Sequence, residues 1–313
     1  MMLIYALAAA LLLLFLATLL LPEQFTRLGL AAERRLSGLE TRQAWVDGFD
    51  MPYLEGGKGE ALVLIHGFGG DKDNFTRIAR FLTPHYRVII PDLPGFGDAS
   101  RDPAASYTMS EQVARVHALL AQLGVGRAHL GGNSMGGFIA AQYAATLPEQ
   151  VATVWLLDPA GTAASHSSPM LQHYEKTGEN PLLVRTVADF DKTISSTTFI
   201  KPFLPRFVIK AMARRAVADF ALHTRIMRQL SESTLLETRY QALATPALIV
   251  WGAQDQILSP AGVDAFRRLF PDSAISVMKD TGHLPMLERP KQTARDYLAW
   301  RVRSPHTVLE TTA

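Results

Sequence analysis

The stretch Leu130–Ala141, LGGNSMGGFIAA, places one serine between two pairs of glycines. A short apolar run precedes it, and an apolar, alanine-rich run follows it. Glycine loses more backbone entropy on folding than any other residue, so four glycines around one serine indicate backbone that bends sharply and stays sterically open. Residues Gly132 to Gly136 fit the pattern Gly-x-Ser-x-Gly of a strand-to-helix turn, in which strained backbone projects the serine hydroxyl above a sheet. The stretch therefore predicts a nucleophile elbow with Ser134 at its tip.

Two other interpretations of these glycines compete with the elbow. A dinucleotide-binding loop, Gly-x-Gly-x-x-Gly, would need glycine at Asn133 if it began at Gly131, and at Ser134 if it began at Gly132, so neither register fits. Close packing of a strand on a helix would also explain the glycines, and the pentapeptide alone does not exclude it. The choice between a nucleophile elbow and close strand–helix packing therefore depends on the rest of the sequence.

Strand-like and helix-like segments alternate along most of the chain. Amphipathic stretches separate short apolar runs that are rich in β-branched residues and end in Gly, Pro, Asp or Asn. These runs are Ala61–Gly67, Tyr86–Asp92, Arg127–Asn133, Val151–Asp158, Pro246–Gly252 and Ala274–Asp280. The alternation predicts an α/β fold with a mostly parallel central sheet and helices on both faces. From Pro159 to Ala244 no strand pattern appears, which predicts an inserted helical cap.

The first residues of the chain are different in kind. Met1–Leu21 carries no charged side chain, and it is long enough to cross a hydrocarbon core of about 30 Å as a helix. A cleaved signal peptide is the alternative, but the segment has no basic start, and Leu19–Leu21 offers no small-residue cleavage site. We therefore expect a single-pass anchor in a bacterial inner membrane. The arginines that follow the segment favour a cytoplasmic catalytic domain.

The domain organisation follows from these patterns. We expect an anchor helix over residues 1–21, a linker over 22–47, a core made of 48–158 and 245–303, and a helical cap over 159–244.

An elbow serine needs a base to take its proton and an acid to orient that base, in the chain order Ser, Asp or Glu, His. Asp255 follows the run that ends in Gly252, and His283 follows the run that ends in Asp280. Both are therefore expected at the carboxyl ends of parallel strands, where open α/β sheets place their sites. Asp158, which also ends a strand, is a rival acid. We rank Asp255 first because a Gly-Ala-Gln turn precedes it, and we predict the triad Ser134, Asp255 and His283.

The stretch His66-Gly-Phe-Gly-Gly70 follows the first of the apolar runs. Acyl transfer creates an oxyanion, which commonly receives one backbone N–H from the residue after the nucleophile and one from an early glycine-containing loop. The expected donors are Met135 and Phe68. We expect His66 to be a structural hydrogen-bonding residue of that loop. A plain tight turn is the alternative reading of this stretch when it is taken without the elbow.

Together these motifs resemble the α/β-hydrolase superfamily, and within it the membrane-associated bacterial lipases and the related monoacylglycerol lipases. The resemblance covers residues 48–300 and depends on the motifs HGFGG with DKDNF after it, DLPGFG, GNSMGG, WGAQD and GHLPMLERP. It implies the same triad, with Phe68 and Met135 as oxyanion donors. Asp98 departs from the pattern, because many relatives carry serine there; we expect the difference to affect loop packing more than chemistry.

The resemblance implies a serine hydrolase that cleaves lipid-like carboxylic esters through an acyl-enzyme. Carbon–carbon bond hydrolases of ring-cleavage products share GNSMGG and are the alternative, although they typically carry Trp where this chain has Leu284. A noncatalytic binding protein on the same scaffold is a third possibility. The basic and apolar stretch Phe199–Lys210 suits a membrane surface or a greasy entrance, although such residues can equally pack between cap and core. We expect Phe203 and Phe207 at that entrance.

Composition limits the possible domain count, partners and cofactors of the protein. The chain has 313 residues, of which 48% are hydrophobic, and this suits one large globular domain with an insertion. The net charge of +2, without a basic run interleaved with aromatics, argues against nucleic acid as a partner. No cysteine is present, so disulfides and thiolate chemistry are excluded. Histidines and carboxylates show no metal-ligand spacing, and we expect neither a metal nor an organic cofactor.

Overall fold

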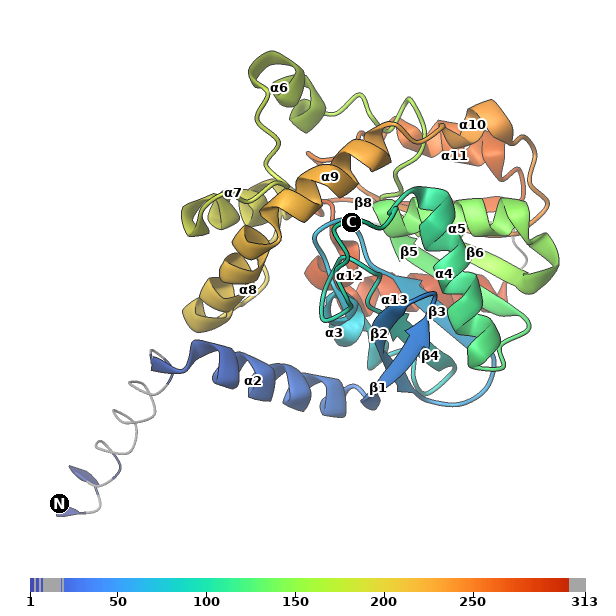
Figure 1. Ribbon diagram of the computed structural model, residues 1–313. Coiled ribbons are helices and arrows are strands. Elements are labelled where there is room, and N and C mark those ends of the chain that lie inside the picture. The colour runs from blue at the N-terminus through green and yellow to red at the C-terminus, as the bar shows by residue number, and fades with distance from the viewer. Residues whose placement is uncertain (3, 6, 8–17, 19, 304–313) are drawn as a thin grey trace.

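A computed structural model of the chain describes residues 1–303 except 3, 6, 8–17 and 19. Its centre is one eight-stranded sheet of order β1-β2-β4-β3-β5-β6-β7-β8 (Figure 1). The strands are β1 (Leu39–Val46), β2 (Phe49–Gly56), β3 (Ala61–Ile65), β4 (Arg87–Pro91), β5 (Ala128–Asn133), β6 (Val151–Leu157), β7 (Ala247–Gly252) and β8 (Ser273–Met278). All neighbours from β4 to β8 are parallel, whereas β1 pairs antiparallel with β2, and β2 with β4. The predicted parallel α/β sheet is confirmed.

The six apolar runs of the sequence form β3 to β8. Every residue of β3, β5 and β7 is buried, as expected for strands covered on both faces. The sequence did not predict the β1–β2 hairpin. In β1 only Leu39, Ala44 and Val46 are buried, so the strand carries no apolar run and too irregular an alternation to be recognised.

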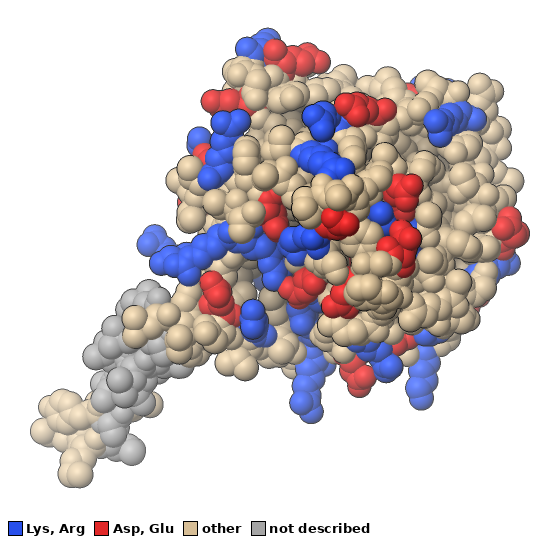
Figure 2. Space-filling model, viewed as in Figure 1, with Lys and Arg blue, Asp and Glu red and all other residues tan. Residues whose placement is uncertain are grey.

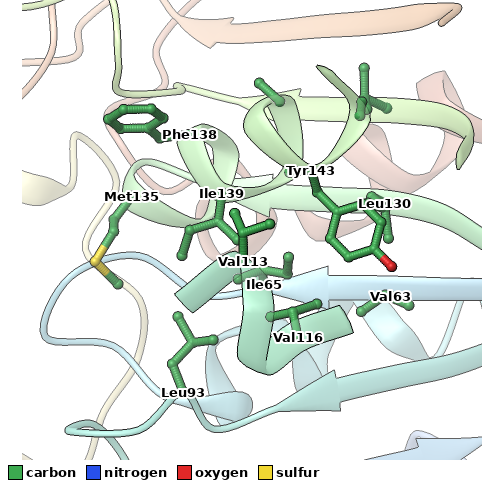
Figure 3. Packing of buried hydrophobic residues seen from close by; sticks show 14 of the residues in the cluster. Val63, Ile65, Leu93, Val113, Val116, Leu130, Met135, Phe138, Ile139 and Tyr143 are labelled. Atoms are coloured by element: carbon green, nitrogen blue, oxygen red, sulfur yellow. The ribbon is translucent and has the colours of Figure 1, made fainter. Parts of the chain in front are cut away.

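Helices cover both faces of the sheet. One face packs against α4 (Met109–Gln122), α5 (Met135–Thr146) and α11 (Gly262–Leu269). Figure 3 shows this layer close by, with Val113 and Val116 of α4 and Ile139 of α5 between the helices and the strands. The other face packs against α3 (Thr76–Ala79), α12 (Pro285–Glu288) and α13 (Pro290–Val302). Both cores are fully buried, so they fix where the strand ends lie.

Between β6 and β7 the chain leaves the sheet and forms an inserted helical cap, as predicted. Its helices are α6 (Pro169–Thr177), α7 (Val187–Thr197), α8 (Arg206–Ala218), α9 (Phe220–Ser231) and α10 (Leu236–Arg239). Figure 1 shows α7, α8 and α9 to one side of the sheet. The cap is thinly packed, because α6 and α7 bury no residue and α8 buries only Ala213.

The segment 22–47, expected to be a linker, contains helix α2 (Pro22–Leu36) and strand β1. The helix begins with a proline, whose fixed φ suits the first turn. The helix dipole is favoured by Glu23 near the start and by Arg34 and Arg35 near the end. Helix α2 packs against cap helix α8, and the ring of Phe25 meets that of Phe207 edge-on at 6.3 Å between centroids. Helix α2 therefore contacts the cap.

Within the described part of the chain, no helix combines the length and the apolar character needed to cross a membrane. The predicted anchor, residues 1–21, falls mainly on positions outside the described residues.

Candidate active site

The predicted nucleophile elbow lies between β5 and α5. Ser134 has φ 56° and ψ −119°, a conformation that is rare for a residue with a side chain and stores backbone strain. A Cβ atom on Gly132 would lie 2.1 Å from the carbonyl oxygen of Gly136, and one on Gly136 would lie 2.1 Å from that of Ile65. Only glycine fits at these two positions. The turn is therefore closed by backbone contacts that larger residues would prevent.

Asp255 and His283 lie together beyond the ends of β7 and β8. The Nδ1 of His283 is 2.8 Å from Oδ2 of Asp255, and both side chains are buried. The other oxygen, Oδ1, accepts the backbone N–H of Ile257 at 2.8 Å and of Leu258 at 3.1 Å. These bonds hold the carboxylate still, so the imidazole ring it contacts is held in one tautomer with Nδ1–H facing Asp255.

The rival acid, Asp158, lies beside this pair. One ligand atom from each of Asp158, Asp255 and His283 can be chosen so that all three lie within 4.8 Å of one another. Asp158 is fully buried, and its Oδ1 accepts the backbone N–H of Gly252 at 2.8 Å. Burial and then the charge of Asp255 raise the pKa of Asp158 well above its usual range. The hydrogen bond to His283 is made by Asp255.

The two expected oxyanion donors flank the serine. Met135 begins α5, where helix geometry leaves its N–H without an intrahelical partner, and Phe68 lies in the loop after β3. Within the described residues, neither backbone N–H donates a hydrogen bond to another group of the chain.

His66 stabilises that loop, as expected. Its Nδ1 donates to the carbonyl of Gly67 at 2.8 Å, and its Nε2 accepts the N–H of Leu93 at 3.1 Å. Burial lowers the pKa of His66, which keeps the ring neutral and suits one donor with one acceptor.

A cavity of about 950 Å³ opens over the elbow, and Ser134, His283 and Phe68 all line it. Apolar side chains from the cap and α12 form part of its wall: Leu182, Val184, Phe190, Ile194, Met212 and Leu287. Another part is charged and comes from α2, α8 and the loop after β3: Arg27, Arg34, Asp71, Asp73, Arg214 and Arg215. The cavity thus reaches from Ser134 to helix α2, and its surface is partly apolar and partly polar.

The two phenylalanines expected at the entrance have different surroundings. Phe203 is 84% exposed and does not itself line the cavity, although its neighbours Pro202 and Leu204 do. Phe207 contacts Phe25 of α2 and does not line the cavity. Phe207 is therefore a packing residue between the cap and α2, which is the second of the two roles that the sequence allowed for this stretch.

Sequence reasoning missed two residues that hold the histidine loop. Asn133 donates from Nδ2 to the carbonyl oxygens of His283 at 2.9 Å and Leu157 at 3.1 Å, so the residue before the serine fixes the loop of the base. The carboxylate of Glu288 accepts four backbone N–H groups at 2.8–3.2 Å, from Phe199, Ile200, Gly282 and Leu284. Both residues lie in motifs that the sequence analysis identified, GNSMGG and GHLPMLERP, but nothing in either motif indicates these partners.

A buried ion cluster joins the segment after β3 to the cap. Lys72 is fully buried and bonds through Nζ to Asp92 and to Asp98, each at 2.6 Å. Asp98 also pairs with Arg215 of α8. Although burial acts in the opposite direction, the bonds and charges of Lys72 and Arg215 lower the pKa of Asp98 to about 2. The residue that departs from the family pattern therefore ties the loop to the cap.

Comparisons with known proteins agree with the fold. A family model for the alpha/beta hydrolase fold matches residues 60–290. Lipase 1 of Psychrobacter immobilis is 40% identical over 276 residues, which cover 86% of this chain and 86% of that protein. The monoacylglycerol lipase ABHD6 of Mus musculus is 26% identical over 303 residues, covering 91% and 90%. A crystal structure described as a membrane phospholipase A, a bacterial virulence factor, superposes with a TM-score of 0.88 at 40% identity and covers 97% of this chain and 99% of that one.

The similarity extends beyond the catalytic motifs. The family model spans the first parallel strand to the start of α13, including the cap, and the resemblance to bacterial lipases and monoacylglycerol lipases is confirmed. By its sequence, its sheet and its elbow, the chain belongs to the α/β-hydrolase family.

Proposed function

We propose that this chain is a serine hydrolase that cleaves carboxylic esters of lipid-like substrates through an acyl-enzyme. The observation that carries the proposal is the hydrogen bond between Asp255 and His283 at the wall of the cavity that Ser134 also lines. Hydrolysis of lipid esters is supported by the lipases and the phospholipase to which the chain is similar.

Each residue has a separate task in this reaction. His283 takes the proton of the Ser134 hydroxyl while the oxygen attacks the ester carbonyl, and Asp255 holds the imidazole and stabilises its cationic form. The carbonyl oxygen becomes an oxyanion, which the N–H groups of Phe68 and Met135 stabilise. The alcohol leaves with the proton from His283. Water then attacks the acyl-enzyme by the same route and releases the carboxylic acid.

The cavity supports a substrate with an apolar chain. Its volume of about 950 Å³ lies near the upper end of ordinary ligand pockets, and the apolar side chains of α7 and α12 offer a surface for an acyl chain. The charged part between α2 and α8 is suited to the polar end of a lipid. The relatives include a phospholipase as well as lipases, so glycerides and phospholipids are both candidates.

The alternative, hydrolysis of a carbon–carbon bond in ring-cleavage products, has less support. Leu284 occupies the position after the catalytic histidine where such hydrolases typically carry tryptophan, and it lines the cavity. A noncatalytic binding protein has no need for the hydrogen-bonded Asp255 and His283.

The reaction is tested by covalent labelling. A fluorophosphonate is expected to modify Ser134 alone, and Ser134→Ala is expected to lose labelling together with about 10³-fold or more of the turnover of a long-chain ester. The catalytic assignment would be wrong if the label were found on another residue. Substrate class is tested separately with esters of increasing acyl length, and a preference for acetate would refute the lipid assignment alone.

We also propose that residues 1–21 anchor the enzyme in the inner membrane, and that 159–244 act as a cap domain on the core made of 48–158 and 245–303. The apolar composition of the first segment and the membrane phospholipase among similar structures support the anchor. Figure 2 shows Lys and Arg side chains gathered in the region of α8, a charge that suits an anionic surface.

Removal of residues 1–21 tests the anchor. The shortened protein is expected to leave the membrane fraction with near-normal turnover of a water-soluble ester. A mature N-terminus beginning after Leu21 would favour a cleaved signal peptide.

A further inference from the structure

Asp158 takes no part in the reaction described above, yet its carboxyl group lies against the triad. It is fully buried at the end of β6, at a positive φ of 44°. Its backbone N–H donates to the carbonyl of Val250, and its Oδ1 accepts the N–H of Gly252. Both contacts are to β7, the strand that carries Asp255. These two contacts hold Asp158 beside the strand that carries the acid of the predicted triad.

The second oxygen of Asp158 is unusual. Within the described residues, Oδ2 receives no hydrogen bond from any donor, although a buried carboxylate oxygen is costly to leave unpaired. The polar groups that face it are Asp255, His283 and the more distant charge of Glu288 on α12. His283 uses Nδ1 on Asp255, and the carboxylates have no proton to give. Among these groups, a hydrogen bond at Oδ2 requires that Oδ2 itself carries a proton.

Asp255 has room for that proton. An ionised carboxylate offers about four acceptor positions. Three are filled, by the N–H groups of Ile257 and Leu258 on Oδ1 and by His283 on Oδ2. One acceptor position of Asp255 is therefore left for the neighbouring carboxyl group, which lies within 4.8 Å. Two ionised carboxylates at this separation in a dry site would repel each other strongly, whereas one proton shared between them removes the repulsion.

We propose that Asp158 is a neutral carboxylic acid whose O–H donates to Asp255, and that it acts as a positioning residue for the triad. The inference rests on the proposed function for its kinetic consequences, but the protonation itself does not depend on it. The bond keeps a single negative charge behind His283 and fixes the orientation of Asp255. Burial and the neighbouring charge of Asp255, which raise the pKa of Asp158, agree with this state at neutral pH.

Infrared difference spectroscopy tests the protonation without any substrate. The spectrum of the full-length wild type minus that of Asp158→Asn at pH 7 is expected to contain the carbonyl band of a protonated carboxylic acid. A difference spectrum with only carboxylate bands would overturn the proposal, whether the second charge were balanced by a bound cation or not. Because this measurement needs no turnover, its failure is distinguishable from failure of the hydrolase assignment, which depends on labelling of Ser134.

Kinetics test the positioning role. Asp158→Ala removes the donor and is expected to lower kcat about tenfold with KM little changed, a loss typical of a displaced catalytic group. Without its hydrogen bond, the charge of Asp255 becomes more concentrated and stabilises the imidazolium form of His283, so the acid limb of the pH–rate profile is expected to move to higher pH. Asp158→Asn keeps a neutral donor and is expected to rescue most of the loss.

The direction of the pH shift separates the two protonation states. If Asp158 were ionised, both substitutions would remove a negative charge near His283 and move the acid limb to lower pH. That result would refute the proposal. Asn at this position can also accept the N–H of Gly252, so this variant remains informative if Asp158→Ala fails to fold.

Discussion

The two walls of the cavity are held in place by different forces. The wall that carries Ser134, Asp255 and His283 follows the parallel strands β5, β7 and β8, of which β5 and β7 are wholly buried. The opposite wall belongs to a cap whose helices bury few residues. Ile226 and Leu236 join the main apolar core, and polar contacts supply the other links. These are Arg215 with Asp98, Arg101 with Asp219, Arg225 with the carbonyl of Ala105, and Gln229 with the N–H of Tyr107.

This difference separates chemistry from selectivity. Apolar burial grows with area and is hard to remove by one substitution, so it suits a wall in which catalytic groups must stay within a fraction of an ångström. Half-exposed ion pairs contribute little each, and a cap held by them can change its side chains without unfolding the core. We therefore expect substitutions on the catalytic wall to affect turnover, and those on the cap to affect substrate preference and stability by smaller amounts.

The largest effect is expected on the catalytic wall. Asp255→Asn should lower kcat by about 10⁴-fold, because the amide favours the wrong tautomer of His283 while the fold is retained. Steady-state kinetics measure the loss, and a melting curve close to that of the wild type is the control. A loss of kcat below tenfold would contradict the expected difference between the two walls, since the wall with Asp255 would then tolerate substitution as the cap does.

An intermediate effect is expected where the cap meets a buried charge. Asp98→Asn should destabilise the protein by about 1–3 kcal/mol, because it leaves the fully buried Lys72 with Asp92 as its remaining carboxylate. Arg215→Ala removes only the half-exposed partner of Asp98 and should cost less than about 1 kcal/mol. Urea unfolding of the two variants measures the difference. Equal costs would contradict the view that the cap side of this cluster is the weak side.

The smallest effect is expected at the exposed edge of the cap. Phe203 is 84% exposed, so Phe203→Ala should change stability by less than about 0.5 kcal/mol while lowering turnover of long-chain esters more than of short ones. Phe207→Ala is the matched control: it should cost about 1 kcal/mol through the lost contact with Phe25 and leave the chain-length profile unchanged. Melting curves and activity on an acyl-length series separate the two. Identical profiles would remove the distinction between entrance and interface.

The sequence predicts the catalytic wall well for a physical reason. Strands buried on both faces must be apolar, and the residues that end them at the elbow and after β7 and β8 are chemically conspicuous. The β1–β2 hairpin was not predicted because one face of its outer strand is exposed. The contacts of Asn133 with His283, Glu288 with Phe199 and Asp98 with Arg215 were invisible, because bonds between residues 89 to 150 positions apart leave no periodic trace in a sequence.

The contacts of Glu288 allow the cap to tolerate side-chain substitutions at positions 199 and 200. The groups that it accepts from the cap are the backbone N–H groups of Phe199 and Ile200, and from the histidine loop those of Gly282 and Leu284. Every residue except proline supplies such a donor, so the side chains at 199 and 200 can diverge freely without loosening the histidine loop. An insertion or deletion there would shift the donors away from the carboxylate. In a family of such enzymes, or in a grafted cap, length at this point should therefore be more strictly kept than identity.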